Sequence, residues 1–322
     1  MTDTLSYLDR LIGFETVSHQ SNLDLVEFVE ERLCSAGCRV TRLPSPDGRK
    51  AGLFAEIGPQ AEGGIVLSAH TDVVPVAGQN WTRPPFRLTA EGTRLYGRGT
   101  TDMKGFVACM MSLADRASHA QLSEPLKLVL SYDEEVGCAG IAEMRDRLAP
   151  LLGNPRYCIV GEPTELSVAT GHKGKMAFTA TFEGEEGHSA LAPRYQNALH
   201  LAGDFMALLR ALQAEFERDG ARDPAFDVPY STVHVGRLTG GTAVNVVPAH
   251  AEMDFEFRHL AQDDPHQILD RITRMAKALA AAHPAGRIAL TRKSAYPGLD
   301  TDETGSVARR VADLAQSQMT KV

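Results

Sequence analysis

Apolar positions follow two periods in the first half of the chain. Residues 4–12 and 22–36 carry apolar side chains at helical spacing, and Gly37 is a suitable stop for the second helix. Short, nearly all-apolar runs then alternate with further helical patterns. Such runs are typical of strands that are buried on both faces of a sheet. They cover residues 64–69, 126–131 and 157–160.

Two shorter strands are predicted at residues 39–43 and 52–57, and helices at residues 105–117 and 139–148. Strands that alternate with helices predict an α/β fold in which the sheet is mostly parallel. In open sheets of this kind, ligands bind beyond the carboxyl ends of the strands. Polar residues that directly follow an apolar run are therefore the first candidates for a site.

The pattern changes near Gly174, where strict alternation replaces the continuous apolar runs. The segments that follow read in the order strand, helix, strand, strand, helix, which predicts a small α+β domain inserted into the first one. They cover residues 175–182, 197–216, 230–235, 251–257 and 265–282. A last apolar run at 288–291 is expected to return the chain to the first domain. We therefore divide the chain into residues 1–173, 174–286 and 287–322.

Composition narrows the possible partners. The length of 322 residues allows two domains, and the formal net charge of −8 argues against nucleic acid or an anionic membrane. Five cysteines without a CxxC pair favour a reducing compartment. The first residues lack the apolar core of a signal peptide, and no apolar run approaches the roughly 20 residues of a membrane span. We expect a cytoplasmic protein.

A histidine and an aspartate follow the first buried run as His70 and Asp72. A histidine that binds a metal needs its second ring nitrogen held by a carboxylate or carbonyl. By itself, this triplet is more typical of an ordinary surface or core histidine than of a metal ligand. Asp102 lies in the glycine-rich segment 97–105, where it is either the N-cap of the next helix or a further ligand.

Acidic residues follow the other two buried runs. Asp133, Glu134 and Glu135 come after residues 126–131, and Glu162 comes after residues 157–160. Adjacent carboxylates repel one another unless a cation or a proton relieves them. A solvated surface is the alternative for such a charge run, but its position behind a buried strand favours a functional role.

One histidine and three carboxylates at strand ends form a ligand set that suits Zn²⁺ or Mn²⁺. A bridging aspartate would allow two metals about 3.5–4 Å apart that share one water. A further carboxylate, not itself a ligand, would then accept the proton of that water. The residues alone therefore point to metal-assisted hydrolysis.

Four blocks occur in order along the chain, at Ser68–Pro75, Tyr96–Gly105, Asp133–Glu135 and Gly161–Thr164. Together they resemble the dizinc family of acetylornithine deacetylase, succinyl-diaminopimelate desuccinylase, carboxypeptidase G and the aminoacylases. The resemblance extends from near the N-terminus to about residue 300. It implies that residues 1–173 and 287–322 form a catalytic, metal-binding domain. It also implies that residues 174–286 form a lid through which the protein makes a homodimer.

The same resemblance implies roles for the metal-centre residues. His70 and Glu162 would bind one metal, Asp102 would bridge to a second, and Glu135 would bind that second metal. Asp72 would orient the His70 ring. Two zinc ions are expected, with Co²⁺ or Mn²⁺ as substitutes.

Further roles concern the reaction. Glu134 would act as general base and then acid, and His188 would reach across the dimer to stabilise the oxyanion. Asn245 and Arg258 match positions that bind the carboxylate of the substrate, a task that suits a guanidinium fork.

Within this family, acetylornithine deacetylase is the nearest branch. The segments that carry this likeness are 75–86, 103–106, 161–164 and 171–176. Thr101 departs from it, because that branch has a cysteine there. The expected reaction is hydrolysis of an N-acyl amino acid, with N2-acetylornithine giving ornithine and acetate in arginine biosynthesis. A succinyl-diaminopimelate desuccinylase or a carboxypeptidase-type hydrolase is the alternative.

Members of this family continue for some tens of residues beyond the point that corresponds to Val322. That segment carries a final histidine of the second metal site, so we expect a catalytic domain truncated at its C-terminus. The first site, with His70, Asp102 and Glu162, would be complete, while the second would have only Asp102 and Glu135. A partner that supplies the histidine, a one-metal variant and a catalytically impaired, metal-poor homodimer are the alternatives.

Overall fold

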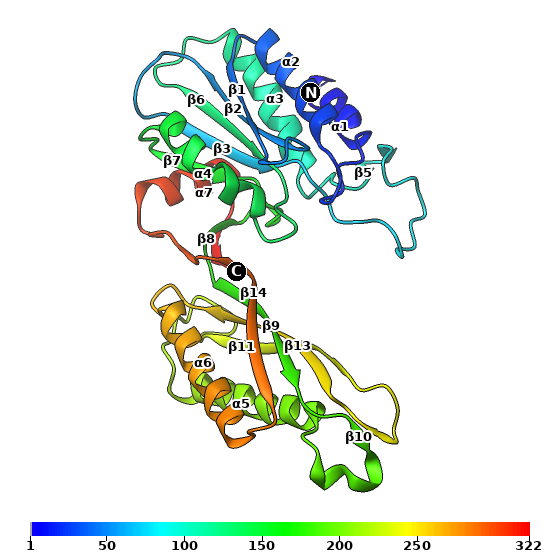
Figure 1. The fold of residues 1–322 in the computed structure, drawn as a ribbon. Helices are drawn as coiled ribbons and strands as arrows, with labels where there is room; N and C mark the ends of the chain where they lie inside the picture. Colours follow the sequence, from blue (N-terminus) through cyan, green and yellow to red (C-terminus); the bar gives the residue numbers. More distant parts are fainter. Residues whose placement is uncertain (1) are drawn as a thin grey trace. The chain divides into compact units, whose positions relative to one another are not determined.

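The computed structural model describes residues 2–322 and divides the chain into two compact units, Met1–Glu165 and Leu166–Val322 (Figure 1). We call them the first unit and the second unit and describe each by itself.

The first unit is built on one mixed sheet with the strand order β1-β2-β6-β3-β7. The strands are β1 (Arg39–Pro44), β2 (Ala51–Ile57), β3 (Ile65–His70), β6 (Leu126–Ser131) and β7 (Tyr157–Val160). The last three run parallel to one another, whereas β1 and β2 join as antiparallel neighbours. The predicted α/β class is thus confirmed, and the parallel strands are the ones that end at the predicted site.

Helices cover both faces of this sheet. They are α1 (Thr2–Ile12), α2 (Leu23–Ser35), α3 (Lys104–Ser118) and α4 (Ala139–Leu152). Successive side chains of a strand point to opposite faces, so Leu128 and Leu130 pack in the core beneath α1, α2 and α3, while Val129 packs in the core beneath α4. This double burial explains why β6 reads as a continuous apolar run. A small hairpin, β4 (Thr89–Glu91) with β5 (Arg94–Tyr96), precedes α3.

Strand β7 corrects one prediction. Its residues alternate between half-buried and exposed, rather than being buried on both faces. The cause is its place at the edge of the sheet, where it pairs only with β3 among the described strands. Its length and position along the chain agree with the prediction, because Tyr157–Val160 is the predicted run.

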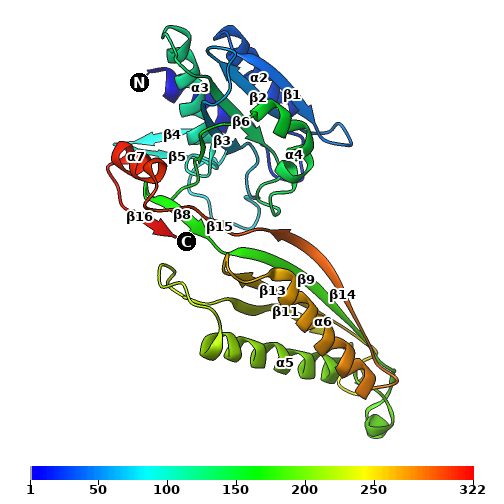
Figure 2. The ribbon, with the colours of Figure 1, turned by 90° about the vertical axis from the view of Figure 1, so that its left-hand side faces the viewer.

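The second unit contains an antiparallel sheet with the order β11-β13-β9-β14 and two helices on one face (Figure 2). The strands are β9 (Gly174–Glu183), β11 (Thr232–Gly240), β13 (His250–His259) and β14 (Arg287–Tyr296), and the helices are α5 (Ala198–Asp219) and α6 (Pro265–Ala282). Aromatic side chains fill the space between sheet and helices, with Phe205 of α5 packed against Phe182 and Phe255. The other face of β9 and β13 is polar, as alternation requires.

Strand β14 corrects a second prediction. Residues 288–291, expected to return the chain to the first domain, lie inside a ten-residue strand that pairs with β9. Because the charged residues Arg292 and Lys293 interrupt the alternation of apolar and polar positions, the full length of this strand could not be predicted from the sequence. The structure accommodates it with a shift of register between Arg292 and Ser294 at the edge of the sheet.

Shorter elements complete the second unit. Strand β10 (Gly187–His188) pairs with β12 (Val246–Val247), and the 3₁₀ helix η1 (Ser189–Arg194) follows β10. A separate sheet joins β15 (Leu299–Asp300), β8 (Val168–His172) and β16 (Met319–Lys321), with α7 (Ser306–Ala315) packed against β8. Among the described residues, no helix combines the length and the hydropathy that crossing a membrane requires.

Candidate metal centre

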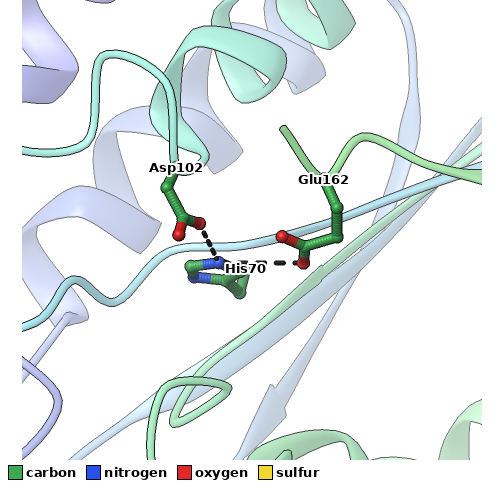
Figure 3. Close-up of side chains that lie close together, drawn as sticks. All are labelled: His70, Asp102 and Glu162. Carbon is green, nitrogen blue, oxygen red and sulfur yellow. Dashed lines mark hydrogen bonds and ion pairs between the residues drawn. The ribbon is translucent and has the colours of Figure 1, made fainter. Parts of the chain in front are cut away.

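Three predicted ligands converge at the carboxyl ends of the parallel strands (Figure 3). His70 is the last residue of β3, Asp102 lies in the loop before α3, and Glu162 follows β7. The Nε2 atom of His70 lies 2.9 Å from Oδ1 of Asp102 and 4.0 Å from Oε1 of Glu162. One potential ligand atom from each residue lies within 4.8 Å of the other two. This is the trio predicted for the first metal site.

The ring of His70 is oriented by contacts on its Nδ1 side. It is 1% exposed, and its Nδ1 lies 2.9 Å from the backbone oxygen of Asp72 and 3.4 Å from the Oδ1 of that residue. A peptide oxygen only accepts hydrogen bonds, so Nδ1 carries a proton, and Nε2 is the nitrogen that faces Asp102 and Glu162. Burial opposes the charged ring, but the contacts with Asp102 and Asp72 prevail and raise the pKa of His70 to about 10.

Asp72 is itself held by three donors. The Ser18 hydroxyl donates to Oδ2 at 2.8 Å, and the backbone N–H groups of Glu134 and Glu135 donate to Oδ1 at 3.0 Å and to Oδ2 at 3.3 Å. Burial alone would raise the pKa of this carboxyl, but His70, Ser18 and the Glu134 amide lower it. Asp72 therefore stays ionised and links the loop after β3 to the loop after β6.

The two glutamates of the acidic run lie beside the trio. Oε2 of Glu134 is 3.9 Å from Nε2 of His70, while Oε1 of Glu134 accepts a hydrogen bond from the Cys138 thiol at 3.3 Å. Burial raises the pKa of Glu135, and the like charge of Asp102 adds to the rise. One carboxylate oxygen of Glu134 is thus anchored and the other faces the centre.

Glu162 shows how strongly negative charge is crowded here. Burial raises its pKa to about 7 against the lowering effect of His70, and Asp102, Glu134 and Glu135 add to the rise. Carboxylates in this arrangement repel one another, and a cation between them would relieve that repulsion. The donor set, one imidazole nitrogen with several carboxylates, also fits Zn²⁺. The residues present therefore fit a metal.

Asp133 and Asp102 resolve two alternatives left open by the sequence. Asp133 forms an ion pair with Lys50, so this member of the acidic run is compensated within the protein. Asp102 does not cap α3: the helix begins at Lys104 after Met103, and the Asp102 carboxylate points to His70 instead. The peptide bond between Asp102 and Met103 is cis.

The candidate substrate residues lie in the second unit and are less enclosed. His188 is exposed in β10, and its Nδ1 accepts a hydrogen bond from the Ala190 amide at 3.1 Å. Asn245 is also exposed, and its backbone oxygen accepts from the Ser189 amide at 3.0 Å. Arg258 lies on β13, where it contacts Glu256 and the Tyr296 hydroxyl at 2.8 and 2.9 Å.

These three residues divide into two places. His188 and Asn245 are neighbours where β10 pairs with β12, beyond the end of β13 at which His250 lies. Arg258 lies at the opposite end of β13. At about 3.3 Å per residue, roughly 26 Å of strand separates His250 from Arg258. One copy of the second unit therefore does not bring His188 and Arg258 to the same small molecule.

No local pattern in the sequence predicts Ser18 or Lys50, although both contact residues that surround the trio. Ser18 is 54 positions from Asp72 in the chain, and Lys50 is 83 positions from Asp133. Contacts at such separations leave no local pattern. The contact between Cys138 and Glu134 differs, because the two residues are four positions apart, just before α4 begins, and such a spacing is a local signal.

A mixed α/β fold with an acidic, histidine-containing cluster at its strand ends is typical of a hydrolase that uses a metal. A sequence model of "peptidase family M20/M25/M40" matches residues 66–316, and the chain belongs to this family.

Curated relatives are acetylornithine deacetylases. The enzyme of Myxococcus xanthus is 33% identical over 324 residues, which cover 98% of this chain and 83% of that relative. The enzyme of Yersinia pestis is 36% identical over 246 residues, which cover 75% of this chain and 62% of the relative. For the latter, the match spans less than two thirds of the relative's length.

Solved structures show the same fold. An M20 family metallo-carboxypeptidase from Sulfolobus solfataricus aligns with all of this chain and 86% of its own, with a TM-score of 0.79 and 17% identity. A dinuclear metal-binding peptidase of the M20 family from Bacillus subtilis aligns with a TM-score of 0.65 and 18% identity, over all of this chain and 82% of its own. At these identities the likeness concerns the fold alone.

Proposed function

We propose that this protein hydrolyses the amide bond of an N-acyl amino acid, and specifically N2-acetylornithine, giving ornithine and acetate for arginine biosynthesis. The observation that carries the proposal is the convergence of His70, Asp102 and Glu162. The carboxylate of Glu134 lies beside this trio without belonging to it. The acetylornithine deacetylases among the relatives support the choice of substrate. Free cysteines support a reducing, cytoplasmic location.

In this proposal His70, Asp102 and Glu162 would hold one Zn²⁺, and Asp102 and Glu135 would contribute to a second. Bound zinc polarises a carbonyl group and lowers the pKa of water toward neutrality. The trio offers its ligand atoms from the end of β3, the loop before α3 and the segment after β7, so a bound metal would also tie these three parts together.

Glu134 moves the protons. Its Oε2 faces the centre, where it takes a proton from the attacking water and later delivers it to the nitrogen of the departing amine. Its Oε1 is anchored by Cys138, so the carboxylate keeps one orientation through both steps. Asp72 keeps the Nδ1 proton of His70 directed away from the centre, which leaves Nε2 as a ligand.

His188 and Arg258 bind the substrate. His188 donates to the oxygen that becomes negative during attack, and the guanidinium of Arg258 pairs with the carboxylate of the amino acid, assisted by Asn245. Because His188 and Arg258 lie at opposite ends of the β9–β13 ladder, we propose that two copies of the chain complete each active site. The homodimer forms through the second unit.

Turnover of N-acetylornithine with added Zn²⁺ or Co²⁺, followed by detection of the free amine, tests the substrate. N-succinyl-diaminopimelate and an N-acylated glutamate serve as comparison substrates. Preference for the acetyl compound supports the proposal, and preference for another substrate reassigns the protein within its family. Absence of turnover of every substrate, with metal bound, contradicts it.

A mixing experiment tests the shared active site. Glu134→Gln and His188→Ala chains are each expected to be nearly inactive. When they are mixed and allowed to exchange, random pairing restores about a quarter of wild-type activity if His188 acts on the other copy's site. If His188 acts within its own chain, no activity returns.

A further inference from the structure

Lys50 lies behind the candidate metal centre and touches neither the trio nor Glu134. Its ammonium group donates to the backbone oxygen of Ser18 and forms an ion pair with the carboxylate of Asp133. The side chains of Lys50 and Asp133 are only 14% and 18% exposed. A pair enclosed to this degree is removed from most of the solvent that screens ion pairs at the surface.

The backbone at Asp133 needs support. Its φ of 53° lies in the left-handed region, which is unfavourable for residues other than glycine and is best tolerated by asparagine and aspartate. The side chain of Asp133 pairs with Lys50, and its backbone oxygen accepts a hydrogen bond from the Ala139 amide at 3.0 Å. This turn directs the next two amides, those of Glu134 and Glu135, at the carboxylate of Asp72.

Ser18 supplies the third donor to Asp72, and its backbone is held on two sides. Its oxygen accepts from Lys50, and its N–H donates to the Val73 oxygen at 3.2 Å. The Ser18 hydroxyl is thereby placed 2.8 Å from Oδ2 of Asp72. One ammonium group thus joins the two segments that together provide all three donors named above for Asp72.

We propose that Lys50 is a positioning residue of the metal centre. It fixes Ser18 and the turn at Asp133, these hold Asp72, and Asp72 holds the His70 ring with Nε2 facing the metal. This inference rests on the proposed metal centre and adds to it a residue that reaches the ligand His70 through three successive contacts. Outer contacts of this kind typically change metal affinity by about 10- to 100-fold, and the distance from the ligand favours the lower end.

The simpler alternative is that Lys50 only balances charge, and it predicts the opposite sign. Removing a positive charge near a cation site makes the site more negative and strengthens cation binding. Removing a positioning residue weakens cation binding. The direction of the change therefore separates the two explanations.

The test is the Zn²⁺ affinity of Lys50→Met, measured on metal-free protein by competition with a chelating dye. We expect an affinity about 10-fold weaker than that of the wild type. Lys127→Met is the matched control: Lys127 is also buried and also donates to a backbone oxygen, that of Leu152, but it lies near the start of β6, away from the site. Lys127→Met is expected to lose stability and keep its affinity.

A wild-type or tighter affinity in Lys50→Met would overturn the inference. Failure of the wild type itself to bind Zn²⁺ would instead overturn the proposed metal centre, so the two failures are distinct. The His70 ring N–H resonance in ¹⁵N-histidine-labelled protein is a second measurement. It should change in metal-free Lys50→Met and stay unchanged in Lys127→Met.

Two milder variants keep the test decisive if Lys50→Met does not fold. Asp133→Asn retains an acceptor for Lys50 and tolerates the left-handed backbone, so its Zn²⁺ affinity should stay within about twofold of wild type. A larger loss of Zn²⁺ affinity would contradict the inference, because Asp133→Asn keeps both the acceptor and the turn. Ser18→Ala should weaken binding several-fold, and a wild-type affinity would remove Ser18 from the path. Where Lys50→Met does fold, additive losses in the double variant Lys50→Met with Ser18→Ala would also contradict a shared path.

Discussion

His70 and His188 are both predicted to take part in the same reaction, yet the protein treats them in opposite ways. His70 ends a central strand, is almost completely buried, and is oriented by a residue that is itself held by three donors. His188 is exposed on a two-residue strand, and its ring contacts a neighbouring amide. A metal requires fixed ligand positions, whereas a group that meets a substrate has to remain accessible. The surroundings of His70 match the first requirement, and the exposure of His188 is compatible with the role proposed for it.

Removal of the metal should have the largest effect on turnover. Of the two histidines, metal binding should depend on His70 of the first unit and not on His188 of the second. Dialysis against a chelator is expected to abolish turnover completely, and Zn²⁺ or Co²⁺ should restore it, because the trio binds through a nitrogen and carboxylates rather than by covalent attachment. His188→Ala should bind as much metal as the wild type by elemental analysis. Activity that survives chelation would remove the metal from the reaction.

Glu134→Gln should come next, with kcat lower by roughly 10²- to 10⁴-fold. Glutamine keeps the size of the side chain and the contact with Cys138 but does not accept a proton as a carboxylate does. Metal content should be unchanged, because Glu134 is not one of the trio. A loss of metal together with activity would show that Glu134 is a ligand rather than the base.

His188→Ala is expected to lower kcat by about 10²- to 10³-fold, the usual effect of removing an oxyanion donor. Stability should hardly change, because the side chain is exposed. His234→Ala is the control, since His234 is an exposed histidine on β11 of the same unit. Equal activity of the two variants would remove His188 from the reaction.

Arg258→Gln should have the smallest effect, about a 10- to 100-fold fall in kcat/KM that comes mainly from KM, because a charge-assisted contact with substrate is lost. Arg237→Gln is matched to it: both arginines belong to the same sheet and pair with carboxylates of β13. Arg237→Gln should stay within about twofold of wild type. A substrate without the amino-acid carboxylate should not distinguish Arg258→Gln from the wild type.

The sequence predicted elements best where a local signal defines both ends. Helix α6 begins and ends as predicted, because Asp264 caps its first turn and Pro265 fits the first helical position. The trio was also predictable, since each member directly follows a buried run or lies in a glycine-rich turn. Strand β14 was missed because Arg292 and Lys293 interrupt its alternation, and pairing with β9 is what makes it a strand.

The contacts that support the trio could not be predicted from the sequence, for a different reason. Asp133 looked like one of three equivalent carboxylates, and the structure separates it from the other two by pairing it with Lys50. Likewise, the spacing of His70 and Asp72 suggested a carboxylate contact, but the shortest contact to the ring is with the backbone oxygen of Asp72. Which group a side chain meets across the fold is decided by packing of distant segments.

The placement of β3 between two parallel neighbours has a consequence for how this protein changes over evolution. Val66 and Leu67 face opposite cores, and His70 pairs in register with Ser131. Inserting or deleting one residue within β3 would exchange those faces and turn His70 away from Asp102. Heritable changes of length are therefore excluded from this strand. New specificities are expected to arise instead by changes of length near exposed positions of the second unit, such as His188 and Asn245, which we propose to meet the substrate.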